Sequence, residues 1–364
     1  MQDGLGRTIA YLRVSVTDRC NLRCRYCMPQ EGIEQFAHAD CLTLEEIYRI
    51  VSVMADMGLK KVRFTGGEPM VRKNLVKLVR DTASTRGIRD VAMTTNGVLF
   101  AEHVEEFAQA GLTSVNISLD TLDAETYARI TGKDALGSVL AAIEKAVELG
   151  LRVKINCVPT RELNGGAGAQ ADDYLRVAEL AKAYPVDVRF IELMPIGCGK
   201  QYTRITGDET LRALIERYGP VAESRTMTGA ENTEQSRTVT GAERAGQEGF
   251  AGAPDSGING PANYVRFPAL QGRIGLIDPM SHQFCATCNR VRLTVDGKLK
   301  LCLYYADSLD LKQLLRDGAS DSELYAAIAE SLLRKPKEHH FLQAGETDAL
   351  GQTPEMRRMV QIGG

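Results

Sequence analysis

The feature that most constrains the fold is a repeated alternation of short apolar strands with amphipathic helices between residues 11 and 194. Each predicted strand is rich in Val and Ile and ends at Gly, Asn, Asp or Pro. The predicted strands cover residues 11–16, 61–65, 90–94, 114–119, 152–158 and 187–193. Six βα units in series predict a parallel sheet with right-handed crossovers. A partial (β/α)6 barrel and an open doubly wound sheet both fit this alternation.

The stretches between the strands have the 3.6-residue periodicity of amphipathic helices. The predicted helices cover residues 43–57, 74–84, 101–110, 124–149 and 171–184. Thr43 and Glu46 have the spacing of a capping box, which predicts the start of the first helix. The long stretch 124–149 is expected to break near Gly132 or Gly137.

Polar and glycine-rich residues gather where the predicted strands end. They are Gly66-Gly67-Glu68-Pro69, Thr94-Thr95-Asn96-Gly97, Ser118-Leu119-Asp120, Asn156 and Glu192-Leu193-Met194. Ligands of parallel α/β folds bind at the carboxyl ends of the strands, so these clusters would share one face of the sheet. Turns favour Gly, Asn and Asp in any case, so one cluster alone is weak, but five together predict a binding site.

Six of the nine cysteines form two triplets, Cys20-x3-Cys24-x2-Cys27 and Cys285-x2-Cys288-x13-Cys302. Four thiolates normally complete a 4Fe–4S cluster or a structural zinc site. Three thiolates on a four-iron cluster leave one iron with an open position, where a substrate or cofactor atom can bind. The two triplets therefore predict an enzyme with two reactive iron–sulfur clusters.

A zinc site is the alternative at each triplet. The first triplet could be a zinc knuckle completed by Cys41, His38 or Cys157, although zinc motifs more often use paired Cys-x2-Cys arms. The second could be a zinc ribbon completed by His282 or Cys198. The chain would then be a zinc-binding nucleotide sensor without catalysis.

Composition is that of an ordinary globular protein. The 364 residues are 44% hydrophobic and 25% charged, enough for one large domain and a smaller one. The formal net charge of −3 gives no basic field for nucleic acid. No apolar run approaches the ~18 residues of a membrane span, and the sequence opens without an export signal. Nine cysteines then suit a reducing compartment, so we expect a cytoplasmic protein with no membrane contact.

A stretch of different composition divides the chain. Residues 221–259 are rich in Gly, Thr, Glu and Ala and contain the repeat SRTMTGAE and SRTVTGAE. Such a segment buries too little apolar area to offset its ordering entropy, so we expect a mobile insert without a catalytic part. It separates a barrel region, 1–220, from a C-terminal region, 260–364. In the latter, Asp296-Gly297 between predicted strands 289–295 and 298–303 predicts a two-residue hairpin.

Basic residues interrupt the predicted strands at Arg13, Arg63, Lys154 and Arg189. Charges in strands buried on both faces are costly unless they are paired or functional, and binding a triphosphate inside a barrel is one such function. Arg290 and Arg292 alternate on one strand and so face one side, where two guanidinium groups suit a triphosphate. A strict two-residue hairpin would pair Val291 with Cys302 and place Cys302 opposite the arginine face, unless a bulge intervenes.

The first triplet, with Tyr26 before its last cysteine, resembles the signature of the radical S-adenosylmethionine (SAM) superfamily. The segment Gly66-Gly67-Glu68-Pro69 resembles the GGEP motif of the same superfamily. This resemblance implies a partial (β/α)6 TIM-like barrel, which decides between the two sheets above. It also implies that SAM binds the open iron of a 4Fe–4S cluster and is cleaved reductively to a 5′-deoxyadenosyl radical.

The segments SVTDRCNLRCRYCMP and FCATCNRVRLTVDGKLKLCL, with the terminal Gly-Gly, resemble the GTP 3′,8-cyclase family of molybdenum cofactor biosynthesis over nearly the whole chain. The resemblance implies an α/β lyase whose smaller C-terminal α+β extension carries a second 4Fe–4S cluster. A purine nitrogen or oxygen could fill the open position of that second cluster. The implied reaction removes hydrogen from C3′ of GTP and joins C3′ to C8 of guanine.

The same resemblance assigns residues to the site. The implied cluster ligands are Cys20, Cys24, Cys27, Cys285, Cys288 and Cys302. The positions that match SAM contacts are Tyr26, Gly67, Ser118 and Met194. The positions that match GTP contacts are Arg13, Arg63, Thr94, Lys154, Arg290 and Arg292, with Lys61, Arg189 and Lys298 as weaker candidates. Gly363-Gly364 resembles a tail that reaches toward the active site. No protein residue is expected to act as a catalytic base, because the radical is generated on SAM.

The resemblance also implies partners. It implies a reductase or a flavodoxin- or ferredoxin-type electron donor, a homodimer, and cyclic pyranopterin monophosphate synthase as the enzyme of the next step. The other enzyme considered is a radical SAM enzyme with an auxiliary cluster, such as a peptide-modifying maturase. Those enzymes usually carry more C-terminal cysteines than this chain has.

Overall fold

One twelve-stranded sheet organises the protein, in the order β12-β11-β10-β1-β2-β3-β4-β5-β6-β9-β8-β7. The structure, a computed structural model, describes residues 1–166, 172–225, 260–306, 309–341 and 353–363. Most of the predicted insert, residues 226–259, lies outside the described residues. The strands are β1 Tyr11–Ser15, β2 Lys61–Thr65, β3 Asp90–Thr95, β4 Ser114–Ser118, β5 Arg152–Cys157, β6 Asp187–Ile191, β7 Glu223–Arg225, β8 Asn263–Arg266, β9 Arg273–Ile277, β10 Arg290–Leu293, β11 Lys298–Lys300 and β12 Leu309–Asp310.

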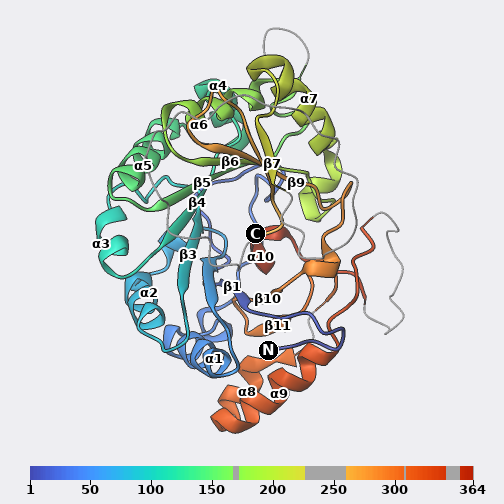
Figure 1. The fold of residues 1–364 in the computed structure, drawn as a ribbon. Coiled ribbons are helices and arrows are strands. Elements are labelled where there is room, and N and C mark those ends of the chain that lie inside the picture. The colour runs from blue at the N-terminus through green and yellow to red at the C-terminus, as the bar shows by residue number, and fades with distance from the viewer. Residues whose placement is uncertain (167–171, 226–259, 307–308, 342–352, 364) are drawn as a thin grey trace, which may run out of the picture.

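Helices lie along the outer side of this curved sheet (Figure 1). They are α1 Leu44–Asp56, α2 Leu75–Ala83, α3 Val104–Gln109, α4 Ala124–Thr131, α5 Leu136–Glu148, α6 Glu179–Ala183, α7 Gly207–Tyr218, α8 Leu311–Arg316, α9 Asp321–Leu333 and α10 Met359–Ile362. The short α10 lies inside the curve, near β1 and β10 (Figure 1). Among the described residues, no helix is both long enough and apolar enough to span a bilayer.

The central eight strands are parallel. Strands β1 to β6 follow one another in sequence order, β10 pairs in parallel with β1, and β9 pairs in parallel with β6. The order begins at β12 and ends at β7, so the barrel is partial, and its helices cover one face as the barrel prediction requires. The C-terminal strands continue this same sheet on both sides. The division of the chain at residues 220 and 260 stays a prediction.

Local signals in the sequence set the helix ends. The predicted capping box is present, because the Glu46 amide donates to Thr43 Oγ1 at 3.1 Å and the Thr43 amide donates to Glu46 Oε2 at 2.8 Å. The stretch 124–149 breaks at Gly132, which ends α4 with a φ of 76°. The predicted helix 171–184 is instead a 3-10 helix, Asp173–Ala178, that leads into α6, and residue 171 lies outside the described residues.

Alternation along the strands separates a dry layer from the barrel interior. On β1, Leu12 and Val14 have no solvent exposure and belong to the main apolar core beneath the helices. Tyr11 and Arg13 alternate with them and therefore face the interior of the barrel. The core fixes which face of each strand is buried against helices, and so it also fixes which side chains are available inside the barrel.

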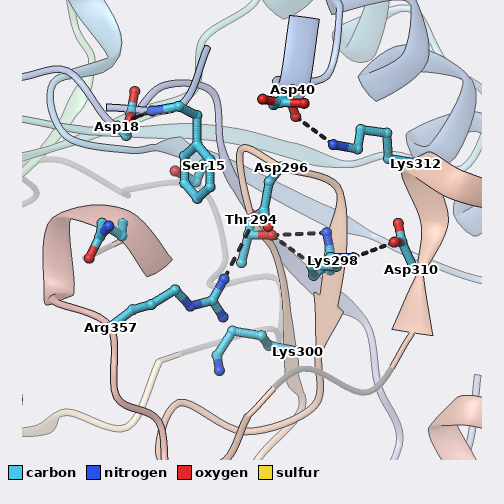
Figure 2. Close-up of polar contacts among 12 residues, drawn as sticks. Ser15, Asp18, Asp40, Thr294, Asp296, Lys298, Lys300, Asp310, Lys312 and Arg357 are labelled. Atoms are coloured by element: carbon cyan, nitrogen blue, oxygen red, sulfur yellow. Dashed lines mark hydrogen bonds and ion pairs between the residues drawn. The ribbon is translucent and has the colours of Figure 1, made fainter. Parts of the chain in front are cut away.

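The C-terminal hairpin has a three-residue loop, which corrects the predicted two-residue turn. Leu293 pairs with Leu299 and Arg292 with Lys300, so the loop comprises residues 295–297. Within the turn, the Gly297 amide donates to the Thr294 carbonyl and the Lys298 amide donates to Thr294 Oγ1. The Lys298 side chain reaches Asp310 on β12 (Figure 2). Gly297 has a φ of 81°, the left-handed conformation such a loop requires. The extra residue moves the register by one.

This shift removes the conflict over the second triplet. When the observed pairing is extended, Cys302 lies opposite Arg290 instead of Val291. Both residues line the same cavity inside the barrel. The three-residue loop thus allows the arginines and Cys302 to face the same cavity.

We predict opposite effects on stability for two glycine-to-alanine substitutions. Gly297→Ala should lower the free energy of unfolding by more than about 1 kcal/mol, because the backbone is left-handed there and a Cβ would lie 2.4 Å from the Lys312 Cβ. Gly137→Ala in α5 should raise it by about 0.5 kcal/mol, because an added Cβ would contact nothing within 4 Å. Urea denaturation of both variants measures the difference, and equal shifts would contradict this account of the hairpin.

Candidate active site

A cavity of about 360 Å³ lies inside the curve of the sheet and receives the predicted site residues from every part of the chain. Its lining includes Arg13, Cys20, Cys24, Tyr26, Cys27, Arg63, Gly67, Thr94, Ser118, Lys154, Met194, Cys285, Cys288, Arg290, Arg292 and Cys302. Two of the weaker candidates, Lys61 and Arg189, line it as well. Lys298 does not belong to this lining and pairs with Asp310 at the edge of the sheet.

Parallel register arranges the basic residues in two rows across β10, β1 and β2. On β1, Tyr11 and Arg13 both face inward, and the neighbouring strands place inward-facing residues directly beside them. The first row holds Arg290, Tyr11 and Lys61, and the second row holds Arg292, Arg13 and Arg63. Because all six side chains line the cavity, the two rows form a continuous basic wall.

The opposite wall is formed by β5 and β6. The Arg189 guanidinium donates to Asn156 Oδ1 at 2.5 Å, and Lys154 lies 4.0 Å from the Asp187 carboxylate. Burial and the nearby Arg189 lower the pKa of Lys154 to about 8. Lys154 and Arg189 therefore extend the basic lining across the cavity from the β1 wall.

Burial makes this concentration of cations costly. It lowers the pKa of Arg13 to about 10, and together with the neighbouring Arg13 it lowers the pKa of Arg292 well below the usual range. Buried cations are expensive unless anions offset their charge. A ligand with several negative charges would provide that offset, and a triphosphate has the charge and the planar oxygen groups that guanidinium groups bind.

Tyr11 is the acidic group within the basic wall, and sequence reasoning missed it. Arg63 donates from Nε to the Tyr11 hydroxyl at 2.5 Å and from Nη1 to the Met93 carbonyl at 3.0 Å. Burial alone would raise the pKa of Tyr11, but Arg63, Arg13 and Lys61 lower it to about 7. The signal was present, because Tyr11 and Arg13 are two residues apart on one strand and must share a face.

The first triplet lies on the loop after β1, and the GGEP turn supports that loop. The Gly67 amide donates to the Thr17 carbonyl at 2.7 Å, and the Glu68 amide donates to the Arg19 carbonyl at 2.8 Å. A Cβ on Gly67 would lie 2.3 Å from the Arg19 carbonyl oxygen, so the contact excludes a side chain at this position. This close approach holds the cysteine loop against the end of β2.

Residues after β4 hold the same loop from the other side. The Tyr26 hydroxyl donates to Asp120 Oδ2 at 2.7 Å, and Asp120 Oδ1 accepts from the Val158 amide at 2.8 Å. Burial raises the pKa of Asp120 to about 6 and the pKa of Cys27 to about 12. The thiols are thus protonated in the metal-free chain, and binding a cationic metal cluster would deprotonate them.

The second triplet is assembled from a 3-10 turn, Cys285–Thr287, with Cys288 directly after it, and from Cys302, two residues after the end of β11. Burial raises the pKa of Cys285 to about 11. Burial would also raise the pKa of Cys288, but Lys335 and Arg290 lower it to about 6. The pKa values of these two thiols therefore shift in opposite directions, because Lys335 and Arg290 offset the effect of burial at Cys288.

All nine cysteines are free thiols, so both triplets are available as metal ligands. Across the described ranges, no three His, Cys, Asp or Glu side chains gather closely enough to hold a single metal ion. In a four-iron cluster each thiolate binds its own iron, so the ligands stand farther apart than around one ion. Three thiols facing one cavity fit a cluster with an open iron at each triplet.

The segment 359–363 enters the cavity between the two triplets. Met359 and Val360 line it, and Arg292 donates to the Gly363 carbonyl. Gly363 has a φ of 77° and approaches Ser15, where a Cβ would lie 3.1 Å from the serine Cβ. The expectation for a tail reaching the site therefore holds for Gly363, while Gly364 lies outside the described residues.

Several aromatic and polar lining residues carried no sequence signal. Phe284, His339 and Phe341 line the cavity beside the second triplet, and the His339 and Phe341 rings make a tilted contact with their centres 4.7 Å apart. They come from irregular segments, where no periodicity shows which side chains face inward. Asn156 was noted only as a residue at a strand end, although its place on β5 two residues after Lys154 gave the same face.

Comparison with known proteins gives two family matches. Residues 14–166 match the family described as Radical SAM superfamily, and residues 242–341 match the family described as Molybdenum Cofactor Synthesis C. Curated relatives match over the full length of both chains. They are the GTP 3′,8-cyclase of Desulforamulus reducens, 41% identical over 368 residues, and that of Clostridium perfringens, 38% identical over 365 residues, each covering 100% of both chains.

Among solved structures, the crystal structure of Streptococcus suis SuiB bound to precursor peptide SuiA is similar, with a TM-score of 0.58. The match covers 93% of this chain and 73% of that chain at 13% sequence identity. At this identity the likeness concerns the fold alone. It is consistent with the parallel, partial barrel and its C-terminal extension.

We predict that Tyr11 makes the binding of a polyanion to the cavity depend on pH. Above about pH 7 the ionised hydroxyl adds a negative charge beside Arg63, Arg13, Lys61 and Arg290, whereas below it the group is neutral. Relative to Tyr11→Phe, the wild-type affinity for inorganic tripolyphosphate should fall roughly fivefold as the pH rises through this range, as for a screened charge pair. Calorimetry of both proteins at matched pH cancels the titration of the phosphate itself. A constant ratio would contradict the prediction.

Proposed function

The chain belongs to the GTP 3′,8-cyclase family of radical SAM enzymes, and we propose that the cavity inside its sheet is where its cofactors and its substrate meet. It converts GTP to (8S)-3′,8-cyclo-7,8-dihydroguanosine 5′-triphosphate, the first step of molybdenum cofactor biosynthesis. Its cofactors are SAM and two 4Fe–4S clusters. The assignment of individual residues to these groups is the proposal developed below.

One observation carries the proposal: both cysteine triplets open into a single cavity that is also lined by buried basic residues. A radical enzyme that cyclises a nucleoside triphosphate needs the radical source, the nucleoside and the phosphate-binding groups within one space. The two rows on β10, β1 and β2 supply cations between the triplets. A peptide substrate has no comparable concentration of negative charge for this wall to bind.

Cys20, Cys24 and Cys27 are proposed to hold the cluster that binds SAM. The cluster and SAM supply the radical chemistry of the first step when they are bound. Around them, Gly67, Ser118 and Met194 line the cavity, and Tyr26 is fixed by its hydrogen bond to Asp120. We assign these four residues to SAM contacts, because Tyr26 lies within the first triplet and the other three come from the carboxyl ends of β2, β4 and β6 in the same cavity.

Cys285, Cys288 and Cys302 are proposed to hold the second cluster, with its open iron toward the guanine base. The triphosphate is assigned to the basic residues Arg13, Arg63, Lys154, Arg290 and Arg292, with Lys61 and Arg189 beside them. Thr94 completes the set, and its hydroxyl lies 3.5 Å from Arg63 Nη1. A substrate held at the base and at the phosphates has its ribose fixed between the two ends.

Fixing the ribose is the main catalytic task of the protein. The radical must meet one hydrogen of C3′, so both ends of GTP must be held rigidly. The apolar residues Val360, Phe341 and Leu303 line the same cavity and help exclude water from the reacting atoms. Hydrogen bonds from the guanidinium groups orient the phosphates, and no side chain is required to remove a proton in the first step.

The partners of the enzyme remain proposals. We propose a reductase or a flavodoxin- or ferredoxin-type electron donor, a homodimer in solution, and cyclic pyranopterin monophosphate synthase as the enzyme that takes the product. We also propose a cytoplasmic location, in keeping with free thiols at all nine cysteines. Residues 221–259 are proposed to be an insert without a catalytic part, and only the first few of them lie within the described residues.

We predict that Cys285→Ser separates the two clusters functionally. The substitution removes one ligand of the second cluster and leaves the first triplet intact, so GTP cyclisation should be lost while reductive cleavage of SAM continues. Anaerobic assays that quantify 5′-deoxyadenosine and the cyclised nucleotide in parallel would measure this. Normal cyclisation of GTP by the variant would show that the substrate site has been assigned wrongly.

A second pair of substitutions tests the phosphate assignment. Arg13→Met should weaken GTP binding by roughly 10- to 100-fold, the loss of one or two hydrogen bonds to a charged group. Lys298→Met is the matched control, because Lys298 lies outside the cavity lining and pairs with Asp310. Equilibrium binding of GTP to both reconstituted variants gives the comparison. Equal affinities for the two variants would remove Arg13 from the binding site.

A further inference from the structure

The N-terminal residues before β1 contact the loop that carries the second triplet. Arg7 is nearly buried, with a side-chain exposure of 9%, and its guanidinium donates to four backbone carbonyls. One is the carbonyl of Cys285, at 2.9 Å, and the others belong to residues 335–337, at 2.8 to 3.3 Å. Asp3 holds the remaining nitrogen, Nε, at 2.6 Å and has a fully buried side chain.

Lys335 continues this arrangement from the segment after α9. It is 5% exposed, and its ammonium group donates to the Arg290 carbonyl at 2.9 Å and to the Leu301 carbonyl. Arg290 lies two residues after Cys288, and Leu301 immediately precedes Cys302. Arg7 in turn bonds the carbonyl of Lys335 itself, at 3.3 Å. The two cations are thus connected through the backbone between them.

Together these bonds reach the backbone at or close to each of the three cysteines, the arms of the triplet. Arg7 binds the first arm at Cys285, and Lys335 binds the second and third arms through their neighbours. Neither side chain lines the cavity, so neither contacts the substrate. The Lys335 ammonium group bonds the backbone close to two of the three cysteines, so its positive charge lies beside the cluster site.

We propose that Arg7 and Lys335 are positioning residues that hold the three arms of the second triplet in place for its cluster. The inference rests on the proposed assignment of Cys285, Cys288 and Cys302 to that cluster. The three arms belong to a 3-10 turn and to the ends of a short hairpin. The backbone hydrogen bonds of these elements are few, so Arg7 and Lys335 supply further restraint. Groups that orient metal ligands from outside commonly decide whether the metal binds and tune its potential.

The test compares reconstituted wild type with Arg7→Met, Arg7→Lys and Lys335→Met. Arg49→Met is the matched control, because Arg49 on α1 pairs with Asp321 at the start of α9 and does not line the cavity. Iron and sulfide per chain are measured after anaerobic reconstitution, together with cleavage of SAM in the absence of GTP. Arg7→Met should bind half as much iron as the control and still cleave SAM, and Arg7→Lys should recover part of the missing iron.

The charge of Lys335 provides a readout that packing alone would not change. A cation beside a cluster favours the reduced, more negative state, so its removal should lower the reduction potential. In Lys335→Met, either the second cluster is missing or its signal in an electron paramagnetic resonance titration appears at a lower potential. An intact second cluster with an unchanged potential would overturn the role of Lys335.

The remaining outcomes separate this inference from the proposed function. Wild type with only one cluster would refute the assignment of the second triplet itself. Wild type with two clusters, and Arg7→Met also with two, would refute the inference and leave the assignment standing. Loss of SAM cleavage or of the circular dichroism spectrum in Arg7→Met would mean that Arg7 serves the whole fold, and this too would overturn the specific role.

Discussion

The parallel pairing of β10 with β1 is the interaction on which the site depends. It places Arg290 and Arg292 in the same rows as Tyr11 and Arg13, although β1 ends at Ser15 and β10 begins only at Arg290. Because side chains alternate, a shift of one residue would turn the arginines out of the cavity. Cys288 lies two residues before the first residue of this strand. One register therefore sets both the basic wall and the second triplet.

The cavity concentrates positive charge inside the protein, where it is expensive. The structure offsets this charge partly from within, through the Tyr11 hydroxyl beside Arg63, the Asn156 oxygen beside Arg189 and the Gly363 carbonyl beside Arg292. Each of these acceptors holds a guanidinium group in a defined orientation before the substrate arrives. A triphosphate then enters a preorganised set of donors, which reduces the ordering needed at binding.

The sequence foretold strands β1 to β6, β10 and β11, the capping box at Thr43 and the break at Gly132, because each depends on a local pattern, whereas β9 beside β6 was not predicted. It also identified side chains that the structure brings to one cavity, since alternation on a strand decides which face a residue occupies. The hairpin loop was predicted one residue too short, because Asp-Gly signals a turn without fixing its length. Arg7 and Lys335 were not found at all. They bind backbone carbonyls, which every residue has, so no pattern of residue types in the sequence indicates these contacts.

The place of β10 beside β1 also has a consequence for biosynthesis. On the ribosome, the strand that begins the barrel emerges first, yet one of its edges stays unpaired until most of the polypeptide has been made. Such distant pairings slow folding and expose strand edges that other molecules can join. Insertion of the second cluster must wait even longer, because the thiols of the second triplet are the last to be synthesised. Maturation of this enzyme is therefore expected to be largely post-translational and to benefit from chaperones that shield a half-built sheet.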